Sequence, residues 1–177
     1  MQRVQEIALI TQVLTLGSQR AFGQLVQAHQ EVVRRFLMRL TGGDSMRADD
    51  LAQETFIRAW QHLDSFRRLS GFQTWLMSIA YRVFLDDERK QMPMTAEPVE
   101  TEPLPTDESS NELLRYDLDR ALATLSVIER TCVVLQCVEG QSIKEIARIT
   151  DLPENTVKSH LLRGKRNLTA FLRKNGY

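Results

Sequence analysis

The 177-residue sequence contains few of the residue types that build metal and redox sites. It has two cysteines, Cys132 and Cys137, and three isolated histidines, His29, His62 and His160. The cysteines lie five residues apart in an apolar segment, so they fall on different faces of a helix and do not match the spacing of zinc ligands. We expect both to be small core residues. The sequence therefore predicts no metal site and no cofactor.

Long apolar runs and catalytic motifs are also missing from the sequence. No run approaches the roughly 18 to 20 apolar residues that span a bilayer, and the N-terminus lacks the pattern of a signal peptide. We expect no membrane insertion and a cytoplasmic location. Paired carboxylates in a plausible cleft, a nucleophile motif and a glycine-rich phosphate loop are absent too. The sequence thus predicts neither an enzyme nor a small-molecule substrate.

The net charge of zero hides three unequal parts. Residues 1–90 carry 12 basic and 10 acidic side chains. Residues 91–112 carry no basic and 6 acidic side chains, and residues 113–177 carry 11 basic and 7 acidic side chains. The acidic middle part holds four of the five prolines and no aromatic residue. Because such a composition cannot bury a core, it predicts a flexible acidic linker, which could extend to roughly 70 Å. We expect two domains, 1–90 and 113–177, that can act well apart.

Apolar residues recur at helical spacing through the N-terminal part. The pattern predicts helices over 18–40, 48–63 and from 72 onward, with a weaker one within 1–16. The helix after residue 72 leaves six side chains outside its apolar stripe: Gln73, Thr74, Met77, Ser78, Tyr81 and Arg82. No strand pattern occurs anywhere in the chain, so the fold class is predicted to be all-α.

The C-terminal part predicts four helices that end in a helix-turn-helix. The first covers 114–125, and the second and third, 126–140 and 142–150, each begin with a Ser-x-x-Glu capping box. A break at 150–152 precedes Pro153, which favours the start of a new helix. A tight turn between two short helices is typical of the DNA-binding arrangement in which the second helix enters the major groove.

The last predicted helix, from Glu154 onward, separates an apolar side from a polar, cationic side. At 100° per residue, Val157, Leu161, Gly164 and Leu168 share one side. Residues 154–177 carry six Lys or Arg against one acid, a local charge of 6 − 1 = +5. We predict that the polar side and its flanks bind DNA, through Asn155, Thr156, Lys158, Ser159, Arg163, Lys165 and Arg166. The plainer interpretation is a packed helix pair with a solvated basic face.

A second candidate interface lies in the N-terminal part, at the loop 64–71 and the helix that follows. The loop places Phe66 beside Arg67 and Arg68. Such a mixture can hold an unstacked nucleotide, or the aromatic can be core and the arginines solvated. From the residues alone, both interpretations stay open. The candidate residues are Phe66, Arg67, Arg68, Gln73, Thr74, Met77, Tyr81 and Arg82.

Two motif sets, in order and separated by the predicted linker, resemble those of the extracytoplasmic-function (ECF) sigma factors, which are sigma subunits of bacterial RNA polymerase. The resemblance covers nearly the whole chain. The N-terminal set is Ala48–Trp60 (ADDLAQETFIRAW), Phe66-Arg67, Phe72–Leu76 (FQTWL), Ile79-Ala80 and Asp86. The C-terminal set is Ala123–Leu125, Glu139-Gly140, Glu145–Ala147 and Thr156–Ser159.

The resemblance implies core RNA polymerase as a partner, through its β′ coiled coil and its β flap. The helix over 48–63 would dock on the coiled coil with Asp49, Asp50, Gln53, Glu54 and Arg58. The loop and helix from residue 65 would capture unpaired bases of the −10 promoter element, with basic side chains on phosphates. The helix from Glu154 would bind the −35 element as duplex. The acidic linker would pass near the RNA exit path, and an anti-sigma factor would be a further partner.

Two residues depart from the family pattern. Asn155 stands where the family usually has Gly, and His160 where Arg is common. The segment also resembles the recognition helix of response-regulator-type activators. This leaves an alternative, a stand-alone helix-turn-helix regulator that binds an operator as a dimer, although that alternative gives no role to 48–60. Two further alternatives fit the sequence poorly. The sequence lacks the motifs of an enzyme that acts on nucleic acid, and a pure adaptor protein would not need the basic helix.

Overall fold

A computed structural model describes residues 3–91 and 118–174, and within these ranges the protein is helical with no strand. The all-α class predicted from the sequence is therefore confirmed. The N-terminal half (3–91) contains α1 (Arg3–Leu16), α2 (Gln19–Leu40), α3 (Ser45–Gln61), the 3₁₀ turn η1 (Leu63–Ser65) and α4 (Phe72–Gln91). The predicted linker, 91–112, lies outside the described residues except for Gln91, the last residue of α4.

The C-terminal half (118–174) begins with helical residues 118–123. It continues with α6 (Val127–Cys137), α7 (Ile143–Thr150) and α8 (Glu154–Lys174). The helix predicted over 126–140 ends three residues early, because the chain turns through Gly140 at φ 66° and the N–H of Gln141 bonds back to the carbonyl of Leu135.

Side-chain caps fix where the helices begin. Both predicted capping boxes form, at the starts of α6 and α7. The side chain of Asp44 accepts a hydrogen bond from the N–H of Arg47, so α3 begins at Ser45 rather than at the predicted residue 48. Ser18 caps α2 in the same way, through the N–H of Ala21. The helix ends therefore follow from local sequence.

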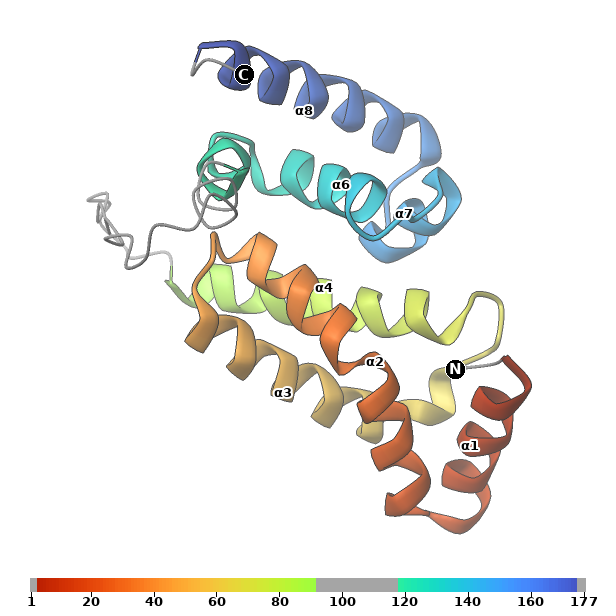
Figure 1. Cartoon of the computed structure of the whole chain (residues 1–177). Helices are drawn as coiled ribbons and strands as arrows, with labels where there is room; N and C mark the ends of the chain where they lie inside the picture. Colours follow the sequence, from red (N-terminus) through yellow and green to blue (C-terminus); the bar gives the residue numbers. More distant parts are fainter. Residues whose placement is uncertain (1–2, 92–117, 175–177) are drawn as a thin grey trace.

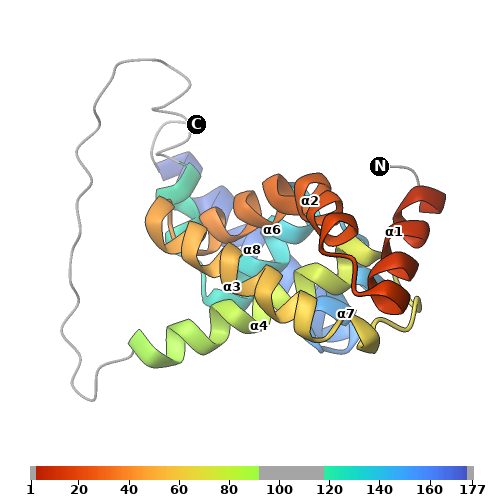
Figure 2. The same cartoon turned by 90° about the horizontal axis from the view of Figure 1, so that it is seen from below.

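Helices α2, α3 and α4 pack around the core of the N-terminal half, and α1 covers one end of α2 (Figure 1). Phe36, Leu37 and Leu76 are fully buried in this core. Seen from below, α3 and α4 lie in front of α6 and α8 (Figure 2). The molecule is thus layered, with α3 at one side and α8 at the other.

The two halves pack directly on each other. Helix α4 lies against α7, and α2 lies against α6, so buried residues of both halves form one continuous hydrophobic cluster. Two ion pairs, Arg35 with Glu139 and Arg39 with Asp119, cross the same boundary. The structure therefore shows a closed arrangement, in which the two halves share one core.

The two cysteines differ in environment. Cys132 is buried, and its burial raises the pKa of its thiol to about 11, whereas Cys137 is exposed in the last turn of α6. The expectation that both are core residues was wrong for Cys137, because five residues advance a helix by about 140° and carry it off the buried face. Within 3–91 and 118–174, no cluster of three candidate metal-ligating side chains occurs, and none of the helices is long and apolar enough to cross a membrane.

Candidate nucleic-acid interface

Helices α7 and α8 form the predicted helix-turn-helix. The turn passes through Asp151, which adopts the left-handed conformation at φ 57° and bonds its N–H to the carbonyl of Ala147. Aspartate tolerates this conformation better than most residues. Pro153 directly precedes α8, and its carbonyl accepts the first helical hydrogen bond from Val157 at 3.0 Å. This geometry fixes the direction in which α8 leaves α7.

One side of α8 packs against α6, as the periodicity predicted. Val157, Leu161 and Gly164 are buried along it. A Cβ atom at Gly164 would lie 2.8 Å from Cγ2 of Val133, so this glycine allows the two helices to approach closely. The opposite side is free of this packing and can face a groove of duplex DNA.

The seven predicted DNA-binding residues of α8 divide into two groups. Asn155, Lys158, Ser159 and Arg166 are exposed on the outer side, and Thr156 is half-buried. By contrast, the guanidinium of Arg163 lies 3.6 Å from Glu129, and the ammonium of Lys165 donates to Gln136 at 2.6 Å. These last two side chains therefore reach toward α6.

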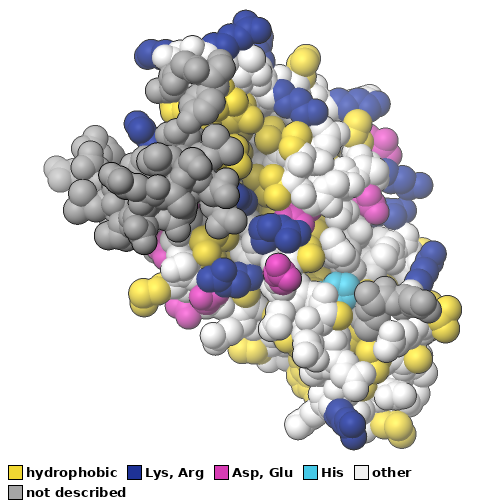
Figure 3. All heavy atoms as spheres, viewed as in Figure 1, with side chains coloured by type: hydrophobic (Ala, Val, Ile, Leu, Met, Phe, Trp, Pro, Cys, Tyr) yellow, Lys and Arg dark blue, Asp and Glu magenta, His cyan; other side chains and the backbone are white. Residues whose placement is uncertain are grey.

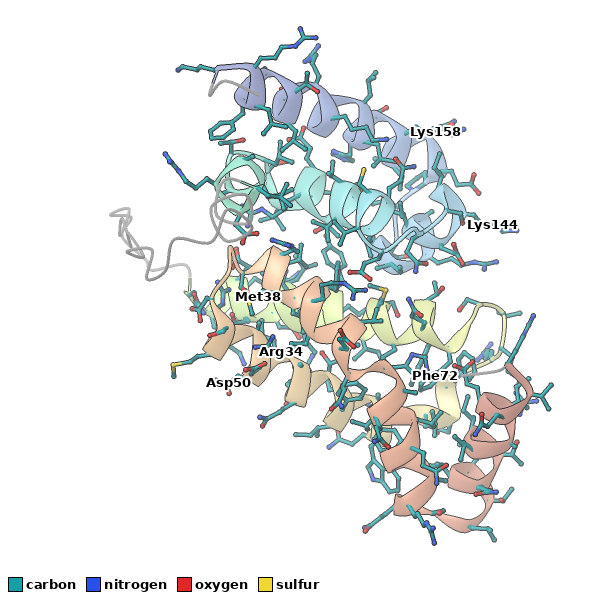
Figure 4. The ribbon with its side chains drawn as sticks, in the orientation of Figure 1. Arg34, Met38, Asp50, Phe72, Lys144 and Lys158 are labelled. Atoms are coloured by element: carbon teal, nitrogen blue, oxygen red, sulfur yellow. The ribbon has the colours of Figure 1, made fainter. Side chains whose placement is uncertain are left out.

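Two cations on α7 extend this surface, and the sequence reasoning missed them. Lys144 and Arg148 are both exposed. Lys144 lies at the same end of the C-terminal half as Lys158 (Figure 4), and Lys and Arg side chains gather along the edge formed by α8 (Figure 3). Because the first helix of a helix-turn-helix crosses the DNA backbone, cations on its polar face were the signal available in the sequence.

The loop before α4 is held by an aromatic cluster. The ring of Phe66 is half-buried, and it packs edge-to-face with Phe72 at 5.5 Å and in a tilted arrangement with Trp75 at 5.4 Å between centroids. Arg67 and Arg68 are exposed, and Arg68 lies at φ 57° with its guanidinium 3.3 Å from Oγ1 of Thr11. The core and solvent interpretations thus both hold in part, since the aromatic anchors a loop that presents two cations.

Three of the α4 residues expected outside the apolar stripe are buried. Thr74, Met77 and Tyr81 are 4%, 0% and 6% exposed, so the expectation of an open face was wrong. The reason is tertiary, because α7 of the C-terminal half packs along α4. Burial raises the pKa of Tyr81. Gln73 is half-buried, and Arg82 is exposed.

A hollow of about 530 Å³ lies beside this loop. Its polar lining comes from both halves: Arg3, Glu6, His29, Arg68, Gln73 and Glu145. Nε2 of His29 lies 3.0 Å from Oε1 of Glu6. The pKa of His29 is below its ordinary value because burial outweighs the attraction of Glu6.

The residues predicted to contact polymerase form a ridge along α3. Asp50 and Gln53 are exposed, and Asp50 lies on the side of the molecule away from Lys158 (Figure 4). The other three are held by ion pairs, Asp49 with Arg34 at 2.5 Å and Arg58 with both Glu54 and Asp86 at 2.7 Å. The hydrogen bond from Arg58 lowers the pKa of Asp86. The charges of this ridge are therefore fixed in position.

The tight turn and the outward cationic side of α8 define a helix-turn-helix DNA-binding protein. Comparison with known proteins then gives the family. Residues 25–93 match the Sigma-70 region 2 family, and residues 115–168 match the Sigma-70, region 4 family. The chain is 32% identical over 172 residues to the ECF RNA polymerase sigma factor SigW of Bacillus subtilis, covering 89% of this chain and 91% of that protein.

It is also 32% identical over 164 residues to the ECF RNA polymerase sigma-E factor of Haemophilus influenzae, covering 84% and 86% of the two chains. The chain therefore belongs to the ECF sigma factors of the sigma-70 family. It is an alternative sigma factor that directs transcription initiation, and its family consists of DNA-binding initiation factors rather than enzymes. Nothing in the comparisons supports the stand-alone regulator.

Two solved structures share the fold. The sigma factor RpoE, in complex with the anti-sigma factor NepR from Bartonella quintana, aligns with a TM-score of 0.70 and 26% identity over 86% of this chain and 96% of that one. CnrH, in complex with the cytosolic domain of CnrY, aligns with a TM-score of 0.72 and 26% identity over 98% of both chains.

Proposed function

We propose that this sigma factor uses three separate surfaces, the first of which is the outer side of α8, bound to the −35 element as duplex. The observation that carries this assignment is the one-sided packing of α8, with Val157 and Leu161 buried while Asn155 and Ser159 face outward. Short polar side chains near the start of a recognition helix reach base edges. Lys158, Lys165 and Arg166 would bind phosphates, with Arg163 and Thr156 at the margin of the base-contacting set.

The second surface binds unpaired bases of the −10 element. Arg67 and Arg68 supply exposed cations for phosphates, and the adjoining hollow is large enough for one flipped base. Phe66 holds the loop in place, and its half-buried ring leaves some surface on which a base could stack. Gln73 and Arg82 flank this region, while Thr74, Met77 and Tyr81 complete it only when the C-terminal half moves away.

The third surface is the α3 ridge, which would dock on the β′ coiled coil of core RNA polymerase while the C-terminal half engages the β flap. Asp50 and Gln53 would make the outward contacts. The ion pairs of Asp49, Glu54 and Arg58 would hold the ridge in one charge pattern, which favours a specific partner surface. Since the polymerase transcribes in the cytoplasm, this is where the protein would act.

An anti-sigma factor is the further partner that we propose. Both structural relatives are described as complexes, RpoE with the anti-sigma factor NepR and CnrH with the cytosolic domain of CnrY. A similar fold at 26% identity supports a partner of the same kind for this chain. The exposed apolar side chains on the two halves, such as Ile57 and Leu162, offer contact area for it.

Transcription in vitro tests the proposed function. Core RNA polymerase would be supplied with a genomic promoter library, with and without this protein. We expect protein-dependent start sites that share two spaced upstream boxes. Output that changes only when a primary sigma factor is already present, with no initiation from core alone, would overturn the proposal.

A further inference from the structure

One large apolar side chain lies on the outer, polar side of α8. Leu162, in the third turn of this helix, is 73% exposed. We propose that Leu162 determines base preference at one position of the −35 duplex, by packing against the C5-methyl group of a thymine in the major groove. This inference rests on the proposed −35 role of α8, and it adds a residue that recognises its base without a hydrogen bond.

The helical register places Leu162 among the side chains that face outward. Leu162 follows Lys158 by four residues and Ser159 by three. It precedes Arg166 by four residues, so all four side chains share one face, and the three polar ones are exposed. At 100° per residue, Leu162 also lies within about 20° of Asn155, two turns earlier. Leu162 is therefore in line with the residues proposed to reach base edges.

The core of the C-terminal half does not use Leu162. The adjacent Leu161 is 5% exposed and packs on the buried side of α8 with Val157 and Gly164. Single exposed leucines are common on protein surfaces and need no explanation on their own. Leu162 differs in its position, because it is the only large apolar side chain of α8 that is exposed, and its neighbours on the same face are polar or cationic.

The long side chains next to Leu162 are held away from it. The stems of Lys and Arg often cover apolar surface beside them. Here, however, the guanidinium of Arg163 lies 3.1 Å from Nδ1 of His160 and 3.6 Å from Glu129, and Lys165 donates to Gln136 at 2.6 Å. The hydroxyl of Ser159 donates to the carbonyl of Asn155 at 3.0 Å, so this short side chain stays close to its own helix. Leu162 is thus left open to a partner.

The chemistry of the major groove selects thymine as that partner. The edges of the four bases present hydrogen-bond donors and acceptors there, and thymine adds an apolar methyl group. Leucine gains by covering this methyl group, whereas against another base edge it would remove water from a polar group without replacing its hydrogen bond. One buried methyl group changes affinity by about fourfold. The proposed contact of Leu162 with an anti-sigma factor does not conflict, because the two contacts would be made in different complexes.

The test compares thymine with uracil, which lacks only the C5-methyl group. Core RNA polymerase loaded with the full chain binds a pool of promoter duplexes whose upstream region is randomised, and the bound duplexes are sequenced. The pool is prepared once with thymine and once with uracil in its place. We expect the parent to enrich T at one position of the −35 box, about fourfold more strongly in the thymine pool than in the uracil pool.

Three variants assign this preference to Leu162. Leu162→Ala should lose the difference between the two pools at that position and keep the parent's preferences at the other positions. Leu162→Met, which is apolar and similar in volume, should retain most of the difference. The matched control Leu16→Ala removes a leucine that is 77% exposed at the end of α1, in the other half. We expect its preferences to equal those of the parent.

The possible outcomes separate this inference from the proposed function. If Leu162→Ala keeps the difference between the pools, if the parent shows none, or if Leu16→Ala loses it as well, the methyl contact is overturned while the −35 role of α8 stands. If the parent shows no sequence preference upstream in either pool, the −35 role fails and this inference fails with it. A loss confined to Leu162→Ala, at one position, supports the inference.

Discussion

The carboxylate of Glu139 is almost fully buried against the guanidinium of Arg35, which donates to both of its oxygens although the two residues are 104 positions apart in the chain. Such a paired arrangement matches the planar fork of arginine to the two oxygens of a carboxylate. The pair joins the N-terminal half to the C-terminal half, so it links their stabilities.

Removal of Arg35 should destabilise the protein because it leaves the Glu139 charge without its partner. We expect Arg35→Ala to lower the free energy of unfolding by about 1–3 kcal/mol, with Arg35→Lys intermediate because an ammonium cannot donate in a fork. Denaturant unfolding measures the difference. Arg35→Ala/Glu139→Gln should recover part of the loss, and an unchanged midpoint in Arg35→Ala would contradict the prediction.

The two glycines that lie inside helices should respond oppositely to alanine. A Cβ at Gly23 meets nothing within 4 Å, so Gly23→Ala should stabilise α2 by about 0.5–1 kcal/mol. A Cβ at Gly164 would meet the stiff side chain of Val133 at 2.8 Å and the backbone of Glu129 at 3.4 Å, so overpacking of about 1–3 kcal/mol should offset or exceed the helical gain. Thermal unfolding of both variants is the measurement. If Gly164→Ala stabilised the protein, the prediction would be wrong, and α6 would be able to shift away from the added Cβ at little cost.

Acid should destabilise the protein through His29. Burial lowers the pKa of this residue from its ordinary value of 6.5, so below that pH the unfolded chain binds a proton that the folded chain does not. Stability should therefore fall as the pH drops from 6.5 through the lower folded pKa. Unfolding midpoints at neutral pH and at about pH 5.5 test this. The loss of stability should be smaller in His29→Gln than in the parent protein. The control His62→Gln, which replaces an exposed histidine, should lose as much as the parent. An equal loss in the parent and both variants would exclude the His29 mechanism.

Lys144 and Asn155 should affect binding to −35 duplex DNA in different ways. Lys144→Ala should weaken binding to all sequences alike and reduce the salt dependence of log K by about 0.9, as expected for one lost phosphate contact. Asn155→Ala should instead cost about 1–3 kcal/mol on the preferred sequence and less on others. Titrations at several salt concentrations, with preferred and scrambled duplexes, distinguish the two. If Lys144→Ala instead weakened binding mainly to the preferred sequence, Lys144 would contact bases rather than phosphate, and the prediction would be wrong.

Those parts of the fold that depend on neighbouring residues were predictable from the sequence. The Ser126 and Ser142 capping boxes and the apolar stripe of α8 involve residues within one or two helical turns, and the structure contains all of them. Two helix ends were missed: the early start of α3, because Asp44 was not recognised as its cap, and the early end of α6 at Cys137. Local patterns therefore determined the elements and most of their ends.

The contacts between the halves had no local signal. Tyr81 lies on the polar side of the α4 pattern, and it is buried in a structure where α7, some sixty residues later in the sequence, packs along α4. The partners of Arg35 and Arg39 are similarly distant. Periodicity cannot tell a face that meets water from one that meets another domain. Periodicity also does not predict the direction of a long side chain, since Lys165 extends from α8 toward Gln136 in α6.

The guanidinium of Arg130 contacts the carbonyls of Leu122, Ala123 and Leu125 in its own half, at 3.0, 3.4 and 3.5 Å, besides that of Leu40. Arginine stays protonated throughout, although burial lowers its pKa. If the halves separated, Arg130 would lose one hydrogen bond of the four and keep three acceptors for its charge. The vacated N–H group and the end of α2 would then both gain water. At this residue, separation would therefore cost little, since the guanidinium would keep its acceptors in its own half.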